Sequence, residues 1–273
     1  MKLKKMLMAA MLAACTVFTG CGGGGDQPAS EAPKDDGAKK IVVGLDDEYP
    51  PMGFKDENNE IVGFDVDLAK EAASRLGRPV EFKGIDWASK EAELKSGRVD
   101  ILWNGLDITP ERQENMLFSD PYMDNRQIVF IRHSEEPSMI TEEASLADLT
   151  VGTQAASTAE DYFAANPELT GRLKELKTYG DYISAFMDLE NGRLDAIVCD
   201  EIVGRYYMSK HPEKIDALDV TVGPTSQFGI AFRKDDTALR DEVQKAFDDM
   251  VKDGAAQKIS NQWFGADLIK AKK

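Results

Sequence analysis

Two successive runs of alternating strand and helix patterns constrain the fold of this 273-residue chain more than any other feature. The first run has apolar strand patterns at 41–43, 80–82 and 99–104, separated by helical patterns at 65–76 and 87–96. Glycines stand where both helical patterns stop, at Gly77 and Gly97. This βαβαβ order predicts parallel strands with right-handed crossovers.

The second run repeats the order later in the chain. It has strand patterns at 149–152, 173–179 and 195–199, with helical patterns at 158–165 and 182–189. The segments 127–132 and 227–232 are apolar and β-rich, and an amphipathic helix pattern over 239–251 stops at Gly254. We therefore expect an α/β protein with two lobes, each built on its own small sheet. One doubly wound domain is the alternative architecture.

The first 20 residues are typical of a signal peptide. Three lysines precede a 13-residue apolar run over 6–18, which is too short to span a bilayer as a helix. The run ends in Phe-Thr-Gly-Cys, which resembles the lipobox of bacterial lipoproteins, so we expect lipidation at Cys21. A lipobox at Cys15 would leave too short an apolar run, and an ordinary cleaved secretion signal is the other alternative. The Gly-, Pro- and charge-rich stretch 21–39 is expected to be a flexible tether.

Composition excludes several classes of function. The chain has 33 Lys+Arg against 49 Asp+Glu, a formal net charge of −16, which repels phosphate backbones and argues against a nucleic-acid partner. Three cysteines and two histidines leave little for a disulfide framework, a zinc site or a Ser-His-Asp triad. We expect no metal and no cofactor. Cys199 is the one cysteine expected within the folded part of the chain.

Polar residues follow several predicted strands, where ligands bind in open α/β sheets. Thr109 and Pro110 are suited to begin a helix, which places Arg112 in its first turn, where its guanidinium could bind a carboxylate. Ser157, followed by Thr158, has capping-box spacing to Glu160 and predicts a second helix N-terminus with free N–H groups. The simpler interpretations are that Arg112 is a surface arginine paired with an acid and that Ser157 is an ordinary helix cap. We name Arg112, Ser157 and Thr158 the anion seat.

An acid and two aromatic residues complete this hypothesis. Asp200 follows the strand pattern at 195–199 and could bind an ammonium group, although on position alone a helix N-cap is the simpler interpretation. We name it the cation seat. Tyr49, in the loop that begins at Asp46, and Trp87 could supply an aromatic wall, although three acids in a row also suit a solvated loop. An anion seat, a cation seat and an aromatic wall together fit a zwitterion such as an α-amino acid.

Several motifs now carry a resemblance to a known family. The run 63–73 (GFDVDLAKEAA) resembles a signature of the polar amino-acid solute-binding proteins of bacterial ABC importers. Further matching motifs are Asp46 with Tyr49, ITPER at 108–112, FSDPY at 118–122, GRLDAIVCD at 192–200 and WFG at 263–265. The resemblance covers about 40–265. We expect the first motif to be structural, capping and packing the helix at 65–76.

The resemblance implies a two-lobed, periplasmic-binding-protein-like (type II) fold with two crossover strands that closes over one amino acid. Lobe 1 would comprise 40–123 and 227–273 and lobe 2 would comprise 127–223, with hinges near 123–127 and 223–227. By motif position, Arg112 would hold the α-carboxylate with backbone N–H groups near Asp107 and Thr158. Asp200 and the Gly105 carbonyl would hold the α-ammonium. Tyr49 and Trp87 would enclose the side chain, and Asp46 and Gln154 would contact its polar end.

One residue departs from the family pattern. The position of Asp107 usually holds Thr or Ser, and an aspartate there could strengthen ammonium recognition, pair with Arg112 or mark an altered ligand. Asp46, Asp107 and Asp200 outnumber Arg112, which favours a basic ligand such as Arg, Lys, ornithine or His, with glutamine or another neutral polar amino acid next.

The resemblance also implies partners and a location. We expect a monomeric, lipid-anchored, extracytoplasmic protein that delivers its ligand to an ABC permease. An enzyme similar to cyclohexadienyl dehydratases is the alternative from another class of function.

Overall fold

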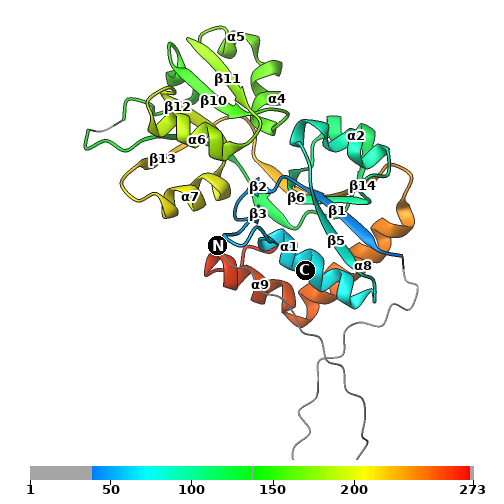
Figure 1. Ribbon diagram of the computed structural model, residues 1–273. Coiled ribbons are helices and arrows are strands. Elements are labelled where there is room, and N and C mark those ends of the chain that lie inside the picture. Colours follow the sequence, from blue (N-terminus) through cyan, green and yellow to red (C-terminus); the bar gives the residue numbers. More distant parts are fainter. Residues whose placement is uncertain (1–38, 137, 271–273) are drawn as a thin grey trace, which may run out of the picture. The chain divides into compact units, whose positions relative to one another are not determined.

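The computed structural model describes residues 39–136 and 138–270 (Figure 1). The expected signal peptide at 1–20, lipidated Cys21 and all of the tether except Lys39 lie outside these residues. Within the described part of the chain, no helix is both long and apolar enough to cross a membrane.

The first sheet has six strands. Its order is β5(Val80–Gly84), β1(Ile41–Leu45), β6(Ile101–Asp107), β14(Ser226–Arg233) and β7(Met116–Phe118), and β8(Met123–Asn125) also pairs with β14. Strand β1 is parallel to β5 and β6, as the βαβαβ order predicts, whereas β14 runs antiparallel to its neighbours.

The second sheet repeats this plan with five strands. Its order is β11(Glu175–Tyr179), β10(Thr150–Gln154), β12(Ala196–Asp200), β9(Gln127–Arg132) and β13(Ile215–Thr221). Strand β10 is parallel to β11 and β12, and β9 is antiparallel to β12 and β13. Two separate α/β sheets confirm the two-lobed prediction, and the single doubly wound domain is wrong.

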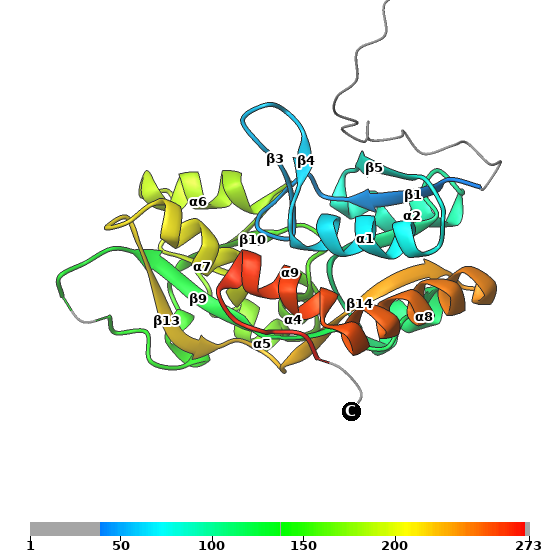
Figure 2. The same cartoon turned by 90° about the horizontal axis from the view of Figure 1, so that it is seen from below.

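Helices cover the sheets. They are α1(Phe64–Arg75), α2(Lys90–Lys95), α3(Pro110–Asn115), α4(Thr158–Ala165), α5(Pro167–Thr170), α6(Tyr182–Glu190), α7(Glu201–Lys210), α8(Thr237–Asp253) and α9(Ala255–Phe264), with 3-10 turns at Trp87–Ser89 and Glu143–Leu146. Figure 2 shows α1, α8 and α9 side by side, and they contact one another. Helix α9 was missed by the sequence analysis, as was the small sheet β2(Glu48–Tyr49), β3(Gly53–Lys55) and β4(Ile61–Val62).

The central strands are buried on both faces, which is typical of parallel sheets covered by helices. Every residue of β6, β10 and β12 is buried. Along β6 the side chains alternate, so that Ile101 and Trp103 pack in one hydrophobic cluster and Leu102 and Leu106 pack in another. This double burial makes the strands rigid supports for the polar residues at their ends.

The chain passes between the two sheets twice. Only Arg126 separates β8 in the first sheet from β9 in the second, and residues 222–225 separate β13 from β14. Arg126 is bound to the second lobe, because its guanidinium forms ion pairs with Glu201 at 2.6 Å and Asp219 at 2.7 Å. These positions fall within or overlap the segments predicted as hinges.

Candidate functional site

The structure places the candidate residues at strand ends and helix starts of the two lobes. From lobe 1 come Asp46 and Tyr49 after β1, Trp87 before α2, Gly105 and Asp107 in β6, and Arg112 in α3. From lobe 2 come Gln154 at the end of β10, Ser157 and Thr158 at the start of α4, and Asp200 at the end of β12. Hydrogen bonds between these two sets hold most of them together.

Arg112 reaches from one lobe to the other. Thr109 is the N-cap of α3 and accepts a hydrogen bond from the Arg112 backbone N–H, with Pro110 next, as the sequence predicts. The buried guanidinium donates to Thr158 Oγ1 at 3.2 Å and to the Ala156 carbonyl oxygen at 3.3 Å. Its ion pair is with Asp161, at 3.3 Å. The surface part of the simpler interpretation is therefore wrong, whereas its pairing with an acid is present.

The second part of the anion seat is the start of α4. Ser157 is the N-cap, and its hydroxyl accepts from the Glu160 backbone N–H at 3.1 Å. The Glu160 carboxylate accepts from the Ala156 backbone N–H, one residue before the N-cap. The predicted capping box is therefore present in a shifted form, with Ala156 in the left-handed region at φ 55°.

Lys90 is a second buried cation here, which its sequence pattern did not indicate. The side chain is 4% exposed, and its ammonium donates to the Ala156 carbonyl oxygen at 2.9 Å. Burial and the neighbouring Arg112 lower the pKa of Lys90 to about 8. The predicted excess of three acids over one base is therefore three acids over two bases.

Asp107 is bound through its own network rather than paired with Arg112. Its carboxylate accepts from Ser226 Oγ at 2.5 Å, Thr158 Oγ1 at 2.6 Å and Asn125 Nδ2 at 3.0 Å. Arg112 contacts only its backbone, by donating to the Asp107 carbonyl oxygen at 3.2 Å. Of the three roles considered for Asp107, direct pairing with Arg112 is thus absent from the structure.

Asp200 is held by three donors and does not cap its helix. It occupies the N-cap position of α7 with no side-chain cap bond. Its carboxylate instead accepts from Tyr49 Oη at 2.6 Å, Asn125 Nδ2 at 2.5 Å and Gln127 Nε2 at 2.7 Å. The simpler N-cap interpretation is therefore wrong for the side chain.

Asn125, another residue that no sequence pattern indicated, joins the two acids. Its amide nitrogen on crossover strand β8 donates to both Asp107 and Asp200, which we name the acid pair. Burial raises the pKa of both carboxyls, and the charge of Asp107 contributes to raising that of Asp200 to about 6. Two buried acids in contact with one amide make a site suited to a cationic group.

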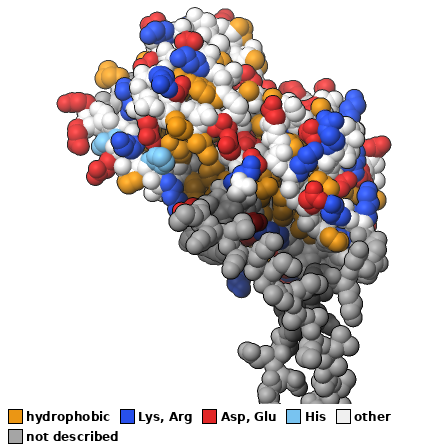
Figure 3. Space-filling model, viewed as in Figure 1, with side chains coloured by type: hydrophobic (Ala, Val, Ile, Leu, Met, Phe, Trp, Pro, Cys, Tyr) orange, Lys and Arg blue, Asp and Glu red, His pale blue; other side chains and the backbone are white. Residues whose placement is uncertain are grey.

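Asp46 belongs to a second, separate acidic region. Its carboxylate accepts from Gln154 Nε2 at 2.6 Å, across the lobes, and burial raises its pKa to about 6. Glu48 and Asp181 add charge nearby, and burial and Asp181 also raise the pKa of Glu48. Figure 3 shows acidic side chains gathered between the lobes on this face.

The aromatic residues are buried but not paired with each other. Tyr49 is 5% exposed and its ring contacts Tyr182, with centroids 6.1 Å apart. Trp87 packs in the hydrophobic cluster that contains Leu102, and the Lys90 ammonium lies 5.0 Å from its ring centroid. Both rings border the charged groups described above.

Gly105 is positioned by the motif that the sequence analysis assigned to helix capping. Asp65 accepts from the Gly105 backbone N–H at 2.7 Å and from Tyr122 Oη at 2.8 Å, and Gly63 at the N-cap makes no side-chain cap bond. Gly105 has φ 55°, and a Cβ there would lie 3.1 Å from Tyr49 Cε1. The motif therefore supports the site as well as packing α1.

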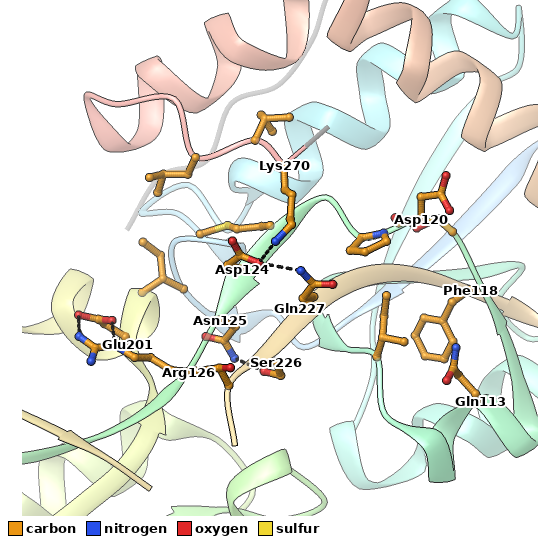
Figure 4. A pocket seen from close by; sticks show the side chains of 18 of the residues that line it. Gln113, Phe118, Asp120, Asp124, Asn125, Arg126, Glu201, Ser226, Gln227 and Lys270 are labelled. Carbon is orange, nitrogen blue, oxygen red and sulfur yellow. Dashed lines mark hydrogen bonds and ion pairs between the residues drawn. The ribbon is translucent and has the colours of Figure 1, made fainter. Parts of the chain in front are cut away.

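A cavity lies beside these residues, along the crossover segments. It has a volume of about 1620 Å³ and is lined by residues of both crossover segments, including Asn125, Arg126 and Ser226, and by Lys270 near the end of the described chain (Figure 4). Asn125 and Ser226, which are bonded to the acid pair, line this cavity, whereas Asp107 and Asp200 do not.

Comparisons with known proteins show the family of this chain. Residues 41–266 match the family described as "Bacterial extracellular solute-binding proteins, family 3". The ABC transporter arginine-binding protein 1 of Escherichia coli is 31% identical over 96% of this chain and 99% of that protein. A probable histidine-binding protein of Neisseria gonorrhoeae is 29% identical over the full length of both.

Solved structures of amino-acid-binding proteins have a similar fold. A substrate-binding protein of an ABC uptake transporter from Streptococcus pneumoniae, with bound histidine, has a TM-score of 0.80 and 35% identity, covering 85% of this chain and 95% of that one. An ancestral arginine-binding protein bound to arginine has a TM-score of 0.77 and 35% identity, covering 83% and 98%. The described chain thus has the two-lobed type II fold.

Proposed function

The chain belongs to the bacterial extracellular solute-binding proteins of family 3 and binds a polar amino acid, and from this premise we propose that its preferred ligands carry a cationic side chain. It is a solute-binding protein rather than an enzyme, and the matches lend no support to the dehydratase alternative.

The separation of buried charge supports this preference. Arg112 and Lys90 lie together at the start of α4, whereas the acid pair and Asp46 occupy other parts of the candidate site. An amino acid with its carboxylate at the cations and its ammonium at the acid pair would extend its side chain toward Asp46. Glu48 and Asp181 make that region more acidic, which favours arginine, lysine, ornithine or histidine over a neutral side chain.

Each candidate residue then has a role. Arg112 binds the α-carboxylate, with N–H groups at the Ser157–Thr158 helix start and near Asp107. Asp200 and the Gly105 carbonyl bind the α-ammonium, and Asp107 adds a second negative charge there. Tyr49 and Trp87 enclose the aliphatic part of the side chain. Asp46 and Gln154 contact its polar end.

Capture is proposed to proceed by hinge closure. A ligand that contacts charged groups of both lobes stabilises the closed arrangement over the open one. A micromolar ligand supplies about 8 kcal/mol, enough to offset a modest preference for opening. The closed protein, lipid-anchored through Cys21 and monomeric, then delivers its ligand to the ABC permease.

A binding screen tests the ligand class. Melting temperature and calorimetric affinity are measured at pH 7.5 with the twenty amino acids plus ornithine, citrulline and cystine. We expect arginine to bind at least tenfold more tightly than citrulline, which has a similar shape and no side-chain charge. If no amino acid changed the melting temperature, the proposed ligand class would be refuted.

A matched pair of variants tests the role of Asp46. Asp46→Asn should remove most of the preference for arginine over citrulline, because it removes the acid facing the side chain. Asp47→Asn makes the same charge change one residue away, where the carboxylate pairs with Lys55 at 2.5 Å, and should keep the preference. Equal loss in both variants would contradict a local role for Asp46.

A further inference from the structure

Lys90 is a buried cation with unusual partners. It begins α2, is 4% exposed, and its ammonium donates to the carbonyl oxygens of Ala156 at 2.9 Å and Trp87 at 3.4 Å. Among the described residues it has no carboxylate within ion-pair distance. Both hydrogen-bond partners are neutral, although buried charges are normally paired with an opposite charge.

A neighbouring positive charge makes the burial of the Lys90 ammonium still less favourable. Arg112, the charge with the largest effect on it, has the same sign and disfavours the protonated ammonium. Asp161 and Glu160 of α4 and Glu91 of α2 act in the opposite direction, and they keep Lys90 largely protonated at neutral pH, with a pKa of about 8. The anion seat therefore holds two neighbouring positive charges.

The geometry of these two cations matches one carboxylate. Lys90 Nζ and Arg112 Nη2 both donate to the same Ala156 oxygen, at 2.9 Å and 3.3 Å. Two donors that share one acceptor oxygen are close enough for the two oxygens of a carboxylate to bridge them. Arg112 and Lys90 come from lobe 1, and Ala156 comes from lobe 2. A ligand carboxylate could therefore take the place of the carbonyl.

We propose that Lys90 is a second carboxylate-binding residue, which makes the site selective for ligands with a free α-carboxylate over their amides and decarboxylated amines. This inference rests on the proposed function. Arg112 alone would accept a carboxamide oxygen as a weaker partner, whereas two cations discriminate more strongly because they favour a full negative charge.

A cycle of two ligands and two variants tests the inference at pH 7. The ligands are L-arginine and L-argininamide, which differ in the carboxylate. Lys90→Met should weaken arginine binding by about 10- to 100-fold and change argininamide binding less than twofold. Lys95→Met alters an exposed lysine on the same helix and should change neither. Loss of less than twofold for arginine, or equal loss for both ligands, would overturn the proposal.

A measurement without ligand separates this inference from the proposed function. Lys90→Met should raise the melting temperature of the free protein, because it replaces a buried ammonium beside Arg112 with an apolar side chain of similar length. A lower melting temperature would show that Lys90 stabilises the fold and would overturn the inference. If wild-type protein bound neither ligand, the arginine preference would fail, while the melting temperature would still decide the role of Lys90.

Discussion

The acid pair should make amino-acid binding depend on pH, and Asp107→Asn should reduce that dependence. Asp107 and Asp200 both accept from Asn125 Nδ2, at 3.0 Å and 2.5 Å. The two accepting oxygens are therefore at most about 5.5 Å apart, which is the sum of the two bond lengths. At an effective dielectric constant of about 20, two charges at that separation repel by roughly 3 kcal/mol. This corresponds to roughly two pKa units. Removing the Asp107 charge should lower the pKa of Asp200 by about one to two units.

The effect on binding follows from the proton on Asp200. Its pKa is about 6, so at pH 5 only about a tenth of the protein has the carboxylate that an ammonium group needs. We expect the Asp200 contribution to weaken wild-type arginine binding about tenfold between pH 7.5 and pH 5. In Asp107→Asn the lower pKa of Asp200 leaves at least about half of this carboxylate ionised at pH 5. The loss of arginine affinity that Asp200 causes over this pH range should therefore be about twofold or less.

Calorimetric titrations of both proteins between pH 5 and 7.5 measure this difference. Asp46 and Asp65 also have raised pKa values, of about 6 and about 7, but they are present in both proteins and cancel in the ratio. Asp124→Asn is the control, since it removes an exposed acid that pairs with Lys270. Parallel pH profiles for wild type and Asp107→Asn would refute the reasoning, as would equal flattening by the control.

Three further predictions concern single residues. Arg112→Ala should weaken arginine binding by roughly 100-fold, because a buried charge partner of the carboxylate is lost, and calorimetry measures this with circular dichroism as the folding control. Gly105→Ala should lower the melting temperature by about 2–6 °C, because φ is 55° and the new Cβ crowds Tyr49; an unchanged value would contradict this. Asp65 has a pKa of about 7 when folded, so the wild-type free energy of unfolding should fall as pH rises from 4 to 8, by on the order of 4 kcal/mol from this group. Urea unfolding of Asp65→Asn should show a flatter profile.

Local patterns predicted most of the regular structure. The helix expected over 158–165 is α4(Thr158–Ala165), and the Thr109–Pro110 start of α3 is present with its cap bond. These features depend on neighbours in sequence, such as caps and apolar periodicity. The strands β2 and β4 are two residues long and carry no detectable period, which explains why the small sheet was missed.

Site residues were predictable where a strand end or a family motif marked them. Arg112 and Asp200 were named from strand ends and Asp107 from the family resemblance, whereas Lys90 lies in the run Lys-Glu-Ala-Glu-Leu-Lys, which looks like an exposed helix face. Its burial depends on Ala156, 66 positions away on the other lobe. Asn125 likewise gains its role from two acids brought together by folding.

The place of Asn125 has a mechanical consequence. It immediately precedes Arg126, the single residue between β8 and β9, so in the proposed hinge closure the acid pair lies beside one of the two crossovers about which the lobes would rotate. In a rotation, displacement grows with distance from the axis. We therefore expect the ammonium-binding groups to stay nearly assembled when the lobes part, while the bonds from Arg112 and Lys90 to Ala156 break. The ammonium group of an incoming amino acid would then bind the acid pair first. Its carboxylate would bind Arg112 and Lys90 afterwards and hold the lobes together.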